Sequence, residues 1–305
     1  MPAADPLHLE FLDHAVQIAR ITGAKIKTAF HSRSSLHIDL KNDNDADLVT
    51  QVDRAVEKEI FTYLRSKYPS HAFVGEEGTS ESGVAATGIS RSDSDTPTWV
   101  VDPVDGTTNF VHGFPFVAVS IAVVVRGMPI VGVVFNPIMD EMFTAVQSGG
   151  AFLNNVALPT PPVRPLASLA SALVASEYGS DRGADVLDAK FATLRDVVGS
   201  PARGVRSLGS AALTMCYVAR GALDAYWEAG VHAWDVAAAA VVLWEAGGLV
   251  GNWVAPASAG QGTRETYDIC ARNVVCVRET QMPEQGPAIM ATIRATLRPV
   301  NYARD

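Results

Sequence analysis

Asp102-Pro-Val-Asp-Gly-Thr-Thr-Asn-Phe110 is the stretch that decides how this chain is interpreted, because it places two carboxylates, a tight turn and two hydroxyls directly behind an apolar segment. The preceding Trp99-Val-Val101 is typical of the end of a buried strand. Pro103 and Gly106 predict a turn, after which residues 107–112 can form a short helix. The sequence therefore predicts a strand end, a turn and a helix start in close succession.

Asp102 and Asp105 would leave the strand end on the same loop. Two carboxylates that close repel each other unless a cation lies between them, and a ligand set made only of oxygen favours Mg²⁺ over zinc. The backbone N–H groups of Gly106, Thr107 and Thr108 at the helix start would then face a bound phosphate. The alternative is a capped turn in which Asp105 is an N-cap and Asp102 lies at the surface, since Asp and Gly are ordinary turn residues.

Residues 73–78, Phe-Val-Gly-Glu-Glu-Gly, form a second short apolar run that ends in carboxylates. If Glu76 and Glu77 lie in a strand, they point to opposite faces, so only one of them is expected to share a site with Asp102. The residue types alone do not decide which one does.

An Ala-rich segment over residues 234–248 predicts a buried helix, whose first turn carries Asp235 and whose end is marked by a pair of glycines. The alternative is that Asp235 is simply the N-cap of this helix. A further carboxylate, Asp53, closes residues 47–53 and is followed by an amphipathic run over residues 54–68. Asp47 and Asp53 fit a role as helix-start residues equally well.

These acidic segments occur in the order that is typical of a known family. The chain resembles the inositol monophosphatase family of Mg²⁺-dependent, lithium-sensitive sugar phosphatases over about residues 9–277, and residues 110–116 and 206–212 resemble its inositol-phosphate branch. The four matching motifs are D-x-V-T-x-x-D at residues 47–53, G-E-E at 75–77, D-P-[IV]-D-G-T-x-N-F at 102–110 and W-D-x-A-A at 234–238. The resemblance implies an α/β fold of the sugar-phosphatase type, a sandwich whose layers alternate as α-β-α-β-α.

The resemblance also implies a ligand set for two or three Mg²⁺ ions. Glu76, Asp102 and the backbone carbonyl of Val104 would hold one ion. Asp102, Asp105 and Asp235 would hold a second, and a weaker third ion would be linked through water near Glu76.

The implied chemistry is attack on phosphorus by a water activated by metal, without a phosphoenzyme, while a second ion stabilises the departing alkoxide. By resemblance, Asp53 and Thr107 orient the attacking water and Glu76 also belongs to the catalytic set. The positions that resemblance assigns to substrate binding are Asp105, Gly106, Thr107, Thr108, Gly209, Ser210, Ala211 and Glu228. The alternatives are that Glu228 is a surface acid and that residues 209–212 are plain helix-start packing.

We therefore expect a phosphomonoesterase that hydrolyses inositol monophosphate or a similar small phosphate ester, as a homodimer by family resemblance. A related phosphatase that acts on fructose 1,6-bisphosphate, histidinol phosphate or a nucleotide phosphate is the alternative within the enzyme class. A catalytically idle homologue that binds a metabolite and regulates a pathway is the alternative outside it, and the intact carboxylate set argues against that alternative.

The composition of the chain limits the classes of binding partner that we expect. The chain has 305 residues, 48% hydrophobic content and a net charge of −9, which argues against nucleic acid or an anionic membrane as the main partner. Its three cysteines, Cys216, Cys270 and Cys276, form no C-x-x-C motif and fit a reducing compartment. The N-terminus does not have the pattern of a signal peptide, so a cytoplasmic location is expected.

One domain over residues 1–305 is expected, with an α+β half over about 1–158 and an α/β half over about 166–305. Residues 79–98 and 254–267, rich in small and polar residues, predict two loops longer than is usual in the family. The predicted helices are 7–30, 184–198, 209–220 and 235–245, and the predicted strands are 117–125, 130–135, 141–146, 172–176 and 222–227, with a short strand or loop over 35–40.

Overall fold

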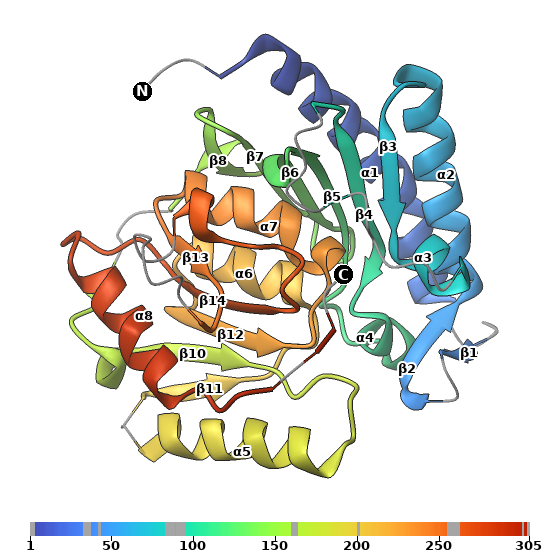
Figure 1. Ribbon diagram of the computed structural model, residues 1–305. Helices are drawn as coiled ribbons and strands as arrows, with labels where there is room; N and C mark the ends of the chain where they lie inside the picture. Colours follow the sequence, from blue (N-terminus) through green and yellow to red (C-terminus); the bar gives the residue numbers. More distant parts are fainter. Residues whose placement is uncertain are drawn as a thin grey trace.

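The protein folds into five layers of helices and sheets, which Figure 1 shows side by side. This computed structural model describes residues 4–32, 38–41, 44–82, 89, 95–159, 164–199, 202–254, 263–300 and 302–303. The layers are, in order, α1 (Pro6–His31) with α2 (Gln51–Lys67), a seven-stranded sheet, α6 (Ala211–Ala219) with α7 (Ala233–Glu245), a five-stranded sheet, and α5 (Ala184–Gly199) with α8 (Gln285–Thr296). The predicted α-β-α-β-α sandwich is confirmed.

The seven-stranded sheet is antiparallel apart from its first pair, in which β3 runs parallel to β4. Its strands follow in chain order: β3 (Ala72–Gly75), β4 (Thr98–Asp105), β5 (Ala118–Val125), β6 (Met128–Asn136), β7 (Glu141–Val146), β8 (Gly150–Leu153) and β9 (Val156–Ala157). A separate antiparallel pair is formed by β1 (Ile38–Lys41) and β2 (Asn44–Thr50).

The five-stranded sheet is mixed. Its strand order is β11 (Gly204–Arg206), β10 (Leu173–Ser176), β12 (Ala225–Ala229), β14 (Asn273–Val277) and β13 (Leu249–Gly251). Strand β10 runs parallel to both its neighbours, whereas β14 is antiparallel to both of its own. The alternation of strands and helices that the sequence predicted therefore yields parallel pairing in only part of the sheet.

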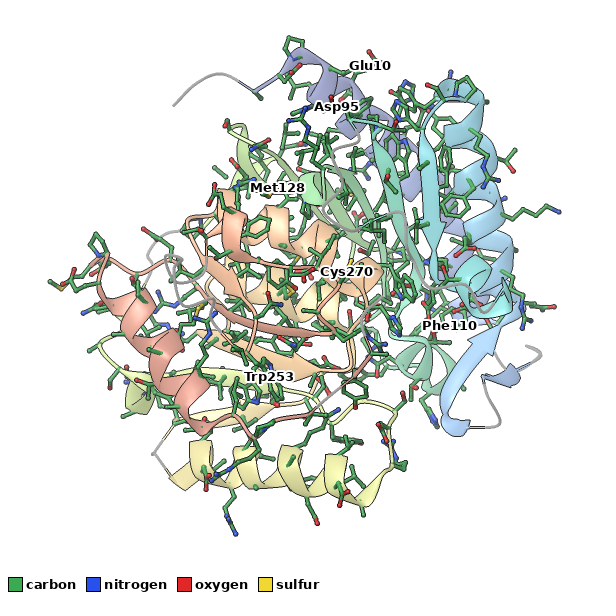
Figure 2. The ribbon with its side chains drawn as sticks, viewed as in Figure 1. Glu10, Asp95, Phe110, Met128, Trp253 and Cys270 are labelled. Carbon is green, nitrogen blue, oxygen red and sulfur yellow. The ribbon has the colours of Figure 1, made fainter. Side chains whose placement is uncertain are left out.

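Strand β5 illustrates why the seven-stranded sheet is apolar on both faces. Val119, Ile121 and Val123 pack in the cluster shared with α1 and α2, whereas Ala118 and Ala122 pack in the cluster shared with α6 and α7. A strand that is covered on both sides has no reason to alternate with polar residues. Figure 2 shows side chains filling the space between the layers, with Cys270 near the centre of the fold.

Small residues bring the sheet and helix α7 unusually close together. A Cβ atom added to Gly132 of β6 would lie 2.2 Å from the backbone oxygen of Ala238 in α7, so no side chain fits at this position. The Ala-rich sequence of α7, which predicted a buried helix, is therefore explained by close packing against a glycine in the sheet. This contact fixes the distance between α7 and the seven-stranded sheet.

Several predicted boundaries need correction. Strand β4 does not end at Val101 but continues to Asp105, with a shift of register between Asp102 and Asp105 that takes the place of the predicted loop. The prediction that Glu76 and Glu77 might lie in a strand is wrong, because the strand ends at Gly75 and both residues begin helix α3 (Glu76–Ser82).

The turn into α3 is held by a buried carboxylate. Glu57 of α2 accepts hydrogen bonds from the backbone N–H groups of Glu77, at 2.9 Å, and Gly78, at 2.8 Å. These N–H groups lie in the first turn of α3, where the helix itself offers no acceptors. Glu57 therefore substitutes for a cap and fixes the direction in which α3 leaves the sheet.

Some predictions lie partly outside the described residues. These are the two long loops, of which 83–88, 90–94 and 255–262 are not described, the boundary between the halves, of which 160–163 are not described, and the strand or loop over 35–40, of which 35–37 are not described. The seven-stranded sheet ends at Ala157 and the five-stranded sheet begins at Leu173 in the chain, while the division into one domain with two halves stays a prediction. Among the described residues, no helix combines the length and apolar character needed to span a membrane.

Candidate active site

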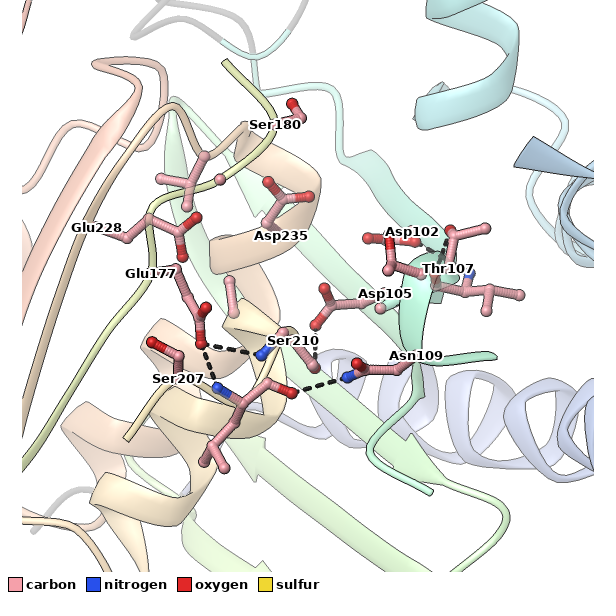
Figure 3. Close-up of a pocket in the computed structure, with 18 of the residues that line it drawn as sticks. Asp102, Asp105, Thr107, Asn109, Glu177, Ser180, Ser207, Ser210, Glu228 and Asp235 are labelled. Atoms are coloured by element: carbon pink, nitrogen blue, oxygen red, sulfur yellow. Dashed lines mark hydrogen bonds between the residues drawn. The ribbon is translucent and has the colours of Figure 1, made fainter. Parts of the chain in front are cut away.

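A cavity of about 540 Å³ lies where four helices begin, namely α3, α4 (Thr107–His112), α6 and α7. Figure 3 shows Glu177 and Glu228 on one side, Asp102 and Thr107 on the other, and Asp105 and Asp235 between them. Its lining includes the residues predicted to bind metal or substrate: Glu76, Asp102, Val104, Asp105, Gly106, Thr107, Thr108, Gly209, Ser210, Ala211, Glu228 and Asp235. Helix starts carry partial positive charge, which favours anions at this place.

The bulge at the end of β4 delivers the first carboxylates to this cavity. The Val104 N–H donates to Oδ1 of Asp102 at 3.0 Å, which holds the bulge in shape. The Oδ2 atom of Asp105 accepts hydrogen bonds from the Ser210 hydroxyl at 2.5 Å and from the Ala212 N–H at 2.8 Å. Asp105 thus ties β4 to the start of α6, and both carboxylates are buried rather than part of a surface turn.

The residue that caps α4 is Gly106, not Asp105. Gly106 has a φ of +95°, and a Cβ atom added there would lie 2.9 Å from the backbone oxygen of Phe116 and 3.0 Å from that of Gly209. Only glycine satisfies both the left-handed conformation and the close approach. The predicted helix over residues 107–112 is confirmed.

Asp235 reaches the cavity from the third position of α7. Its Oδ2 atom accepts a hydrogen bond of 2.7 Å from the backbone N–H of His232, which is the N-cap residue. The alternative in which Asp235 itself is the N-cap is therefore wrong. The His232 ring stacks on Trp234 with ring centroids 4.4 Å apart, which fixes the first turn of the helix and with it the position of Asp235.

Burial and mutual repulsion act on this acidic cluster. Burial, with a smaller contribution from the charge of Glu76, raises the pKa of Asp105 to about 7, against the hydrogen bonds from Ser210 and Ala212. Burial also raises the pKa of Asp235 well above its ordinary value, and the neighbouring charges of Asp105 and Glu76 add to this effect. A cation between these groups would relieve the repulsion, because it stabilises the charged carboxylates.

The donor set fits a hard divalent cation, since it consists of carboxylates and a backbone carbonyl. As the side chains are oriented here, no three Asp, Glu, His or Cys side chains in the described part of the chain converge closely enough to hold one ion. Asp102, Asp105 and Asp235 each accept hydrogen bonds from protein donors instead.

Asp53 lies behind the cavity wall and contacts Thr107. Its Oδ2 atom accepts from the Thr50 N–H at 3.0 Å in a capping box at the start of α2, and its Oδ1 atom accepts from the Thr107 hydroxyl at 3.1 Å. Asp53 is thus both a helix-start residue and a partner of Thr107, so the two alternatives for this residue do not exclude each other. The side chain of Asp47 lies outside the described residues.

Two carboxylates, Glu177 and Glu228, line the far end of the cavity, and a buried phenol contacts one of them. Tyr226 donates a hydrogen bond to Glu228, and burial together with the charge of Glu177 raises the pKa of Glu228 to about 8. Glu228 belongs to the interior wall of the cavity, so the alternative that it is a surface acid is wrong. Ser210 is the N-cap of α6, so the segment around it is a helix start as well as part of the lining.

Several polar residues that line this cavity were not predicted, among them Glu177 and Asn109. Glu177 accepts hydrogen bonds from the N–H groups of Leu208 and Gly209, the latter at 2.9 Å. Asn109 donates to the backbone oxygens of Phe116 at 2.8 Å and Leu208 at 2.7 Å, which joins α4 to the segment before α6. Asn109 belongs to the motif at residues 102–110, whereas nothing in the local sequence distinguishes Glu177 from a surface acid.

Comparison with known proteins identifies the family. The profile of the inositol monophosphatase family matches residues 8–291. Inositol monophosphatase 2 of Solanum lycopersicum is 46% identical over 242 residues, which cover 79% of this chain and 86% of the tomato protein. Inositol monophosphatase 1 of Rattus norvegicus is 40% identical over 282 residues, which cover 92% of this chain and 94% of the rat protein.

Two solved structures share the fold. The extragenic suppressor protein suhB from Bartonella henselae superposes with a TM-score of 0.75 at 31% identity, covering 94% of this chain and 98% of that one. The inositol monophosphatase from Anabaena (Nostoc) superposes with a TM-score of 0.71 at 27% identity, covering 95% and 96% of the two chains. With its four acidic segments gathered around one cavity, this chain belongs to the inositol monophosphatase family.

Proposed function

We propose that the protein hydrolyses inositol monophosphate to inositol and phosphate. The observation that carries the proposal is one cavity with two chemically distinct ends: a buried acidic cluster around Asp105 next to helix starts, and a hydroxyl-accepting end at Glu228. A phosphate ester of a polyol has the matching two ends, an anionic phosphate and a group rich in hydroxyl donors. Relatives named inositol monophosphatase, 37–46% identical over most of the chain, support the same reaction.

The family is generally metal-dependent, and we propose that the ions are Mg²⁺, two or three in each subunit. Glu76, Asp102 and the Val104 carbonyl would hold one ion, and Asp102, Asp105 and Asp235 would hold another. Bound divalent cations would lower the pKa of water and neutralise charge on the phosphate oxygens. The exposed backbone N–H groups at the start of α4 add further positive potential at this end.

Thr107 is proposed to orient the attacking water. Its hydroxyl lies 3.1 Å from both Asp53 Oδ1 and the Val104 carbonyl oxygen, and it can donate its single proton to only one of them at a time. When Asp53 accepts that proton, the lone pairs of the hydroxyl remain available to accept a hydrogen bond from water. Asp53 is held in place by Thr50, so the pair offers a fixed acceptor in the cavity wall.

Glu228 is proposed to accept hydrogen bonds from hydroxyls of the substrate alcohol. Its Oε2 atom is engaged by Tyr226, and this bond fixes the plane of the carboxylate. Hydrogen bonds to a charged acceptor are stronger than neutral ones, so the ionised form of Glu228 would bind a polyol best. The segment around Gly209 and Ser210 borders the same end of the cavity.

The test is phosphate release from a panel of esters: inositol monophosphates, fructose 1,6-bisphosphate, histidinol phosphate and nucleotide phosphates. Each is assayed with Mg²⁺, with EDTA and with Mg²⁺ plus Li⁺. We expect Mg²⁺-dependent turnover with a clear preference for inositol monophosphates. Preference for another ester would assign a related phosphatase activity to the protein. If no ester in the panel releases phosphate, the result would favour a metabolite-binding regulator.

A homodimer and a cytoplasmic location are also proposed, the first by family resemblance and the second from the reduced state expected of three cysteines. The three cysteines are buried, and none of them forms a disulfide. Light scattering on purified protein measures the mass of the assembly directly, and a mass equal to the 32.4 kDa chain would contradict the dimer.

A further inference from the structure

Helix α5 carries a buried lysine directly behind the hydroxyl-accepting end of the cavity. Lys190 is 8% exposed, although lysine is almost never buried without a partner. Its Nζ atom donates hydrogen bonds to the backbone oxygens of Tyr178 and Ala229, both at 2.9 Å. The ammonium group therefore joins two strand ends that are far apart in the sequence, since Tyr178 follows β10 and Ala229 ends β12.

Both joined segments form the wall of the cavity. Tyr178 and its neighbours Glu177 and Gly179 line it, and so does Glu228, the residue before Ala229. A second, very small cavity lies behind this wall, and its lining includes Lys190, Glu177 and Glu228 together. Lys190 thus faces the two carboxylates from behind, on the side opposite to the substrate.

The geometry at Gly179 shows how near the charges lie. A Cβ atom added to Gly179 would be 3.3 Å from Nζ of Lys190 and 3.9 Å from Oε1 of Glu228, so the ammonium and the carboxylate both border the space beside this glycine. The attraction between Lys190 and Glu228 favours the charged form of both groups, while burial lowers the pKa of Lys190 and raises that of Glu228.

Other charged and titratable groups surround the lysine. Its Nζ atom lies 5.6 Å from the ring centroid of Tyr302, a ring that Arg272 also approaches at 5.4 Å. Burial and the Asp181 carboxylate raise the pKa of Tyr302 to about 12, so the ring stays neutral beside the two cations. The charge of Asp181 raises the pKa of Lys190, whereas the charge of Arg182, in the same segment, lowers it.

We propose that Lys190 is a positioning residue for substrate binding: it holds the two wall segments in register and supplies positive charge that favours the ionised form of Glu228 as acceptor for the substrate hydroxyls. The inference rests on the proposed role of Glu228 in binding the alcohol part of the substrate. In the described part of the chain the hydrogen bonds of Lys190 go to the alcohol end and to no residue assigned to the phosphate, so we expect its effect to be confined to the alcohol end. A lysine that served only the fold would affect both ends alike or neither.

The test separates the two ends of the cavity by comparing two constants in one assay. The KM for inositol monophosphate reports both ends, whereas the inhibition constant of inorganic phosphate reports only the phosphate end. Lys190→Met removes the charge and the hydrogen bonds. Lys190→Gln keeps two N–H donors for the carbonyls of Tyr178 and Ala229 but carries no charge, so it preserves the tie and serves where Lys190→Met does not fold. Neither constant depends on the fraction of enzyme that is folded.

We expect each variant to raise KM about tenfold, the effect of weakening a hydrogen bond to a charged acceptor, while the inhibition constant of phosphate stays within about twofold of wild type. Lys58→Met, which removes an exposed lysine of α2, is the matched control and should change neither constant. An unchanged KM, or a parallel rise of KM and the inhibition constant, would overturn the proposal.

Failure of the proposed function gives a different result. Wild-type protein that releases no phosphate from inositol monophosphate refutes that function, whatever the variants do, and the same comparison is then made with the ester that the substrate panel identifies. Wild-type protein that is active on inositol monophosphate, with variants of unchanged KM, refutes only the role of Lys190.

Discussion

Replacing Asp105 by Asn should stabilise the metal-free protein while abolishing its activity. In the folded protein the pKa of Asp105 is raised from 3.8 to about 7 by burial, with the charge of Glu76 adding to the effect. Between these two pH values the folded state binds more protons than the unfolded chain, so its stability falls as the pH rises, and the loss is complete above about pH 7. The difference between the two pKa values corresponds to a loss on the order of 4 kcal/mol.

The Asn side chain removes the charge but keeps an acceptor. Its amide oxygen can still accept from the Ser210 hydroxyl and the Ala212 N–H, so the link between β4 and α6 survives. The repulsion with Glu76 and Asp235 disappears. Above about pH 7 the metal-free variant should therefore be more stable than the wild type by up to a few kcal/mol, and this advantage should shrink as the pH falls toward 4.

The assay is urea unfolding in EDTA at about pH 5.5 and about pH 8, repeated with Mg²⁺ in place of EDTA. Mg²⁺ should stabilise the wild type at the higher pH, and should stabilise the Asp105→Asn variant less, because the variant lacks a ligand of one of the two proposed ions. Asp188→Asn, at an exposed position of α5, is the control and should behave as wild type. The reasoning is refuted if the metal-free wild type is equally stable at both pH values, or if Asp105→Asn is the less stable protein at pH 8.

Four further outcomes follow from the structure. Asp102→Asn should lower kcat at least about 100-fold with the circular dichroism spectrum unchanged, because it removes a carboxylate proposed to bridge two ions; substantial residual turnover would contradict the ligand set. Glu228→Gln should raise KM for inositol monophosphate about tenfold without changing the inhibition constant of phosphate, and equal effects on both would contradict its place at the alcohol end. Lithium in the millimolar range should inhibit in competition with Mg²⁺, and indifference to it would point to a more distant branch of the family. Gly132→Ala should lower the free energy of unfolding, measured in urea, by about 1–3 kcal/mol or more, since its Cβ would lie 2.2 Å from the Ala238 oxygen. The control is Gly199→Ala, which has no atom within 4 Å of the added Cβ and should leave stability unchanged in the same assay.

The sequence predicted well those elements that carry a local signal. Helix α1 and the helix over residues 107–112 came out at or within a residue of their predicted bounds, because amphipathic period and glycine punctuation are local signals. Strands β8, β9 and β11 have two to four residues and were not predicted, since their existence depends on a neighbour in the sheet. The C-terminal elements β13, β14 and α8 were also not predicted.

Motifs predicted the acidic end of the cavity better than the alcohol end. Asp102 and Asp105 stand in one short motif, so their proximity was visible in the sequence, and resemblance added Asp235 from a distant segment. Glu177 and Lys190 carry no such signal, because a glutamate after a strand and a lysine in a helix are usually exposed. The place of Glu177 beside Glu228, and that of Lys190 behind both, depend on how β10, β12 and α5 meet in three dimensions.

The late position of α7 in the chain has a consequence for synthesis on the ribosome. The seven-stranded sheet is complete at Ala157, but one of its faces packs against α7, which begins only at Ala233. A nascent chain of intermediate length therefore contains the complete sheet, but Val134 and Phe143 are not yet packed against α7. Such an exposed apolar surface binds chaperones or promotes aggregation. Asp235 arrives on the same helix, so the emerging protein covers its sheet and gains its last acidic side chain in a single docking step.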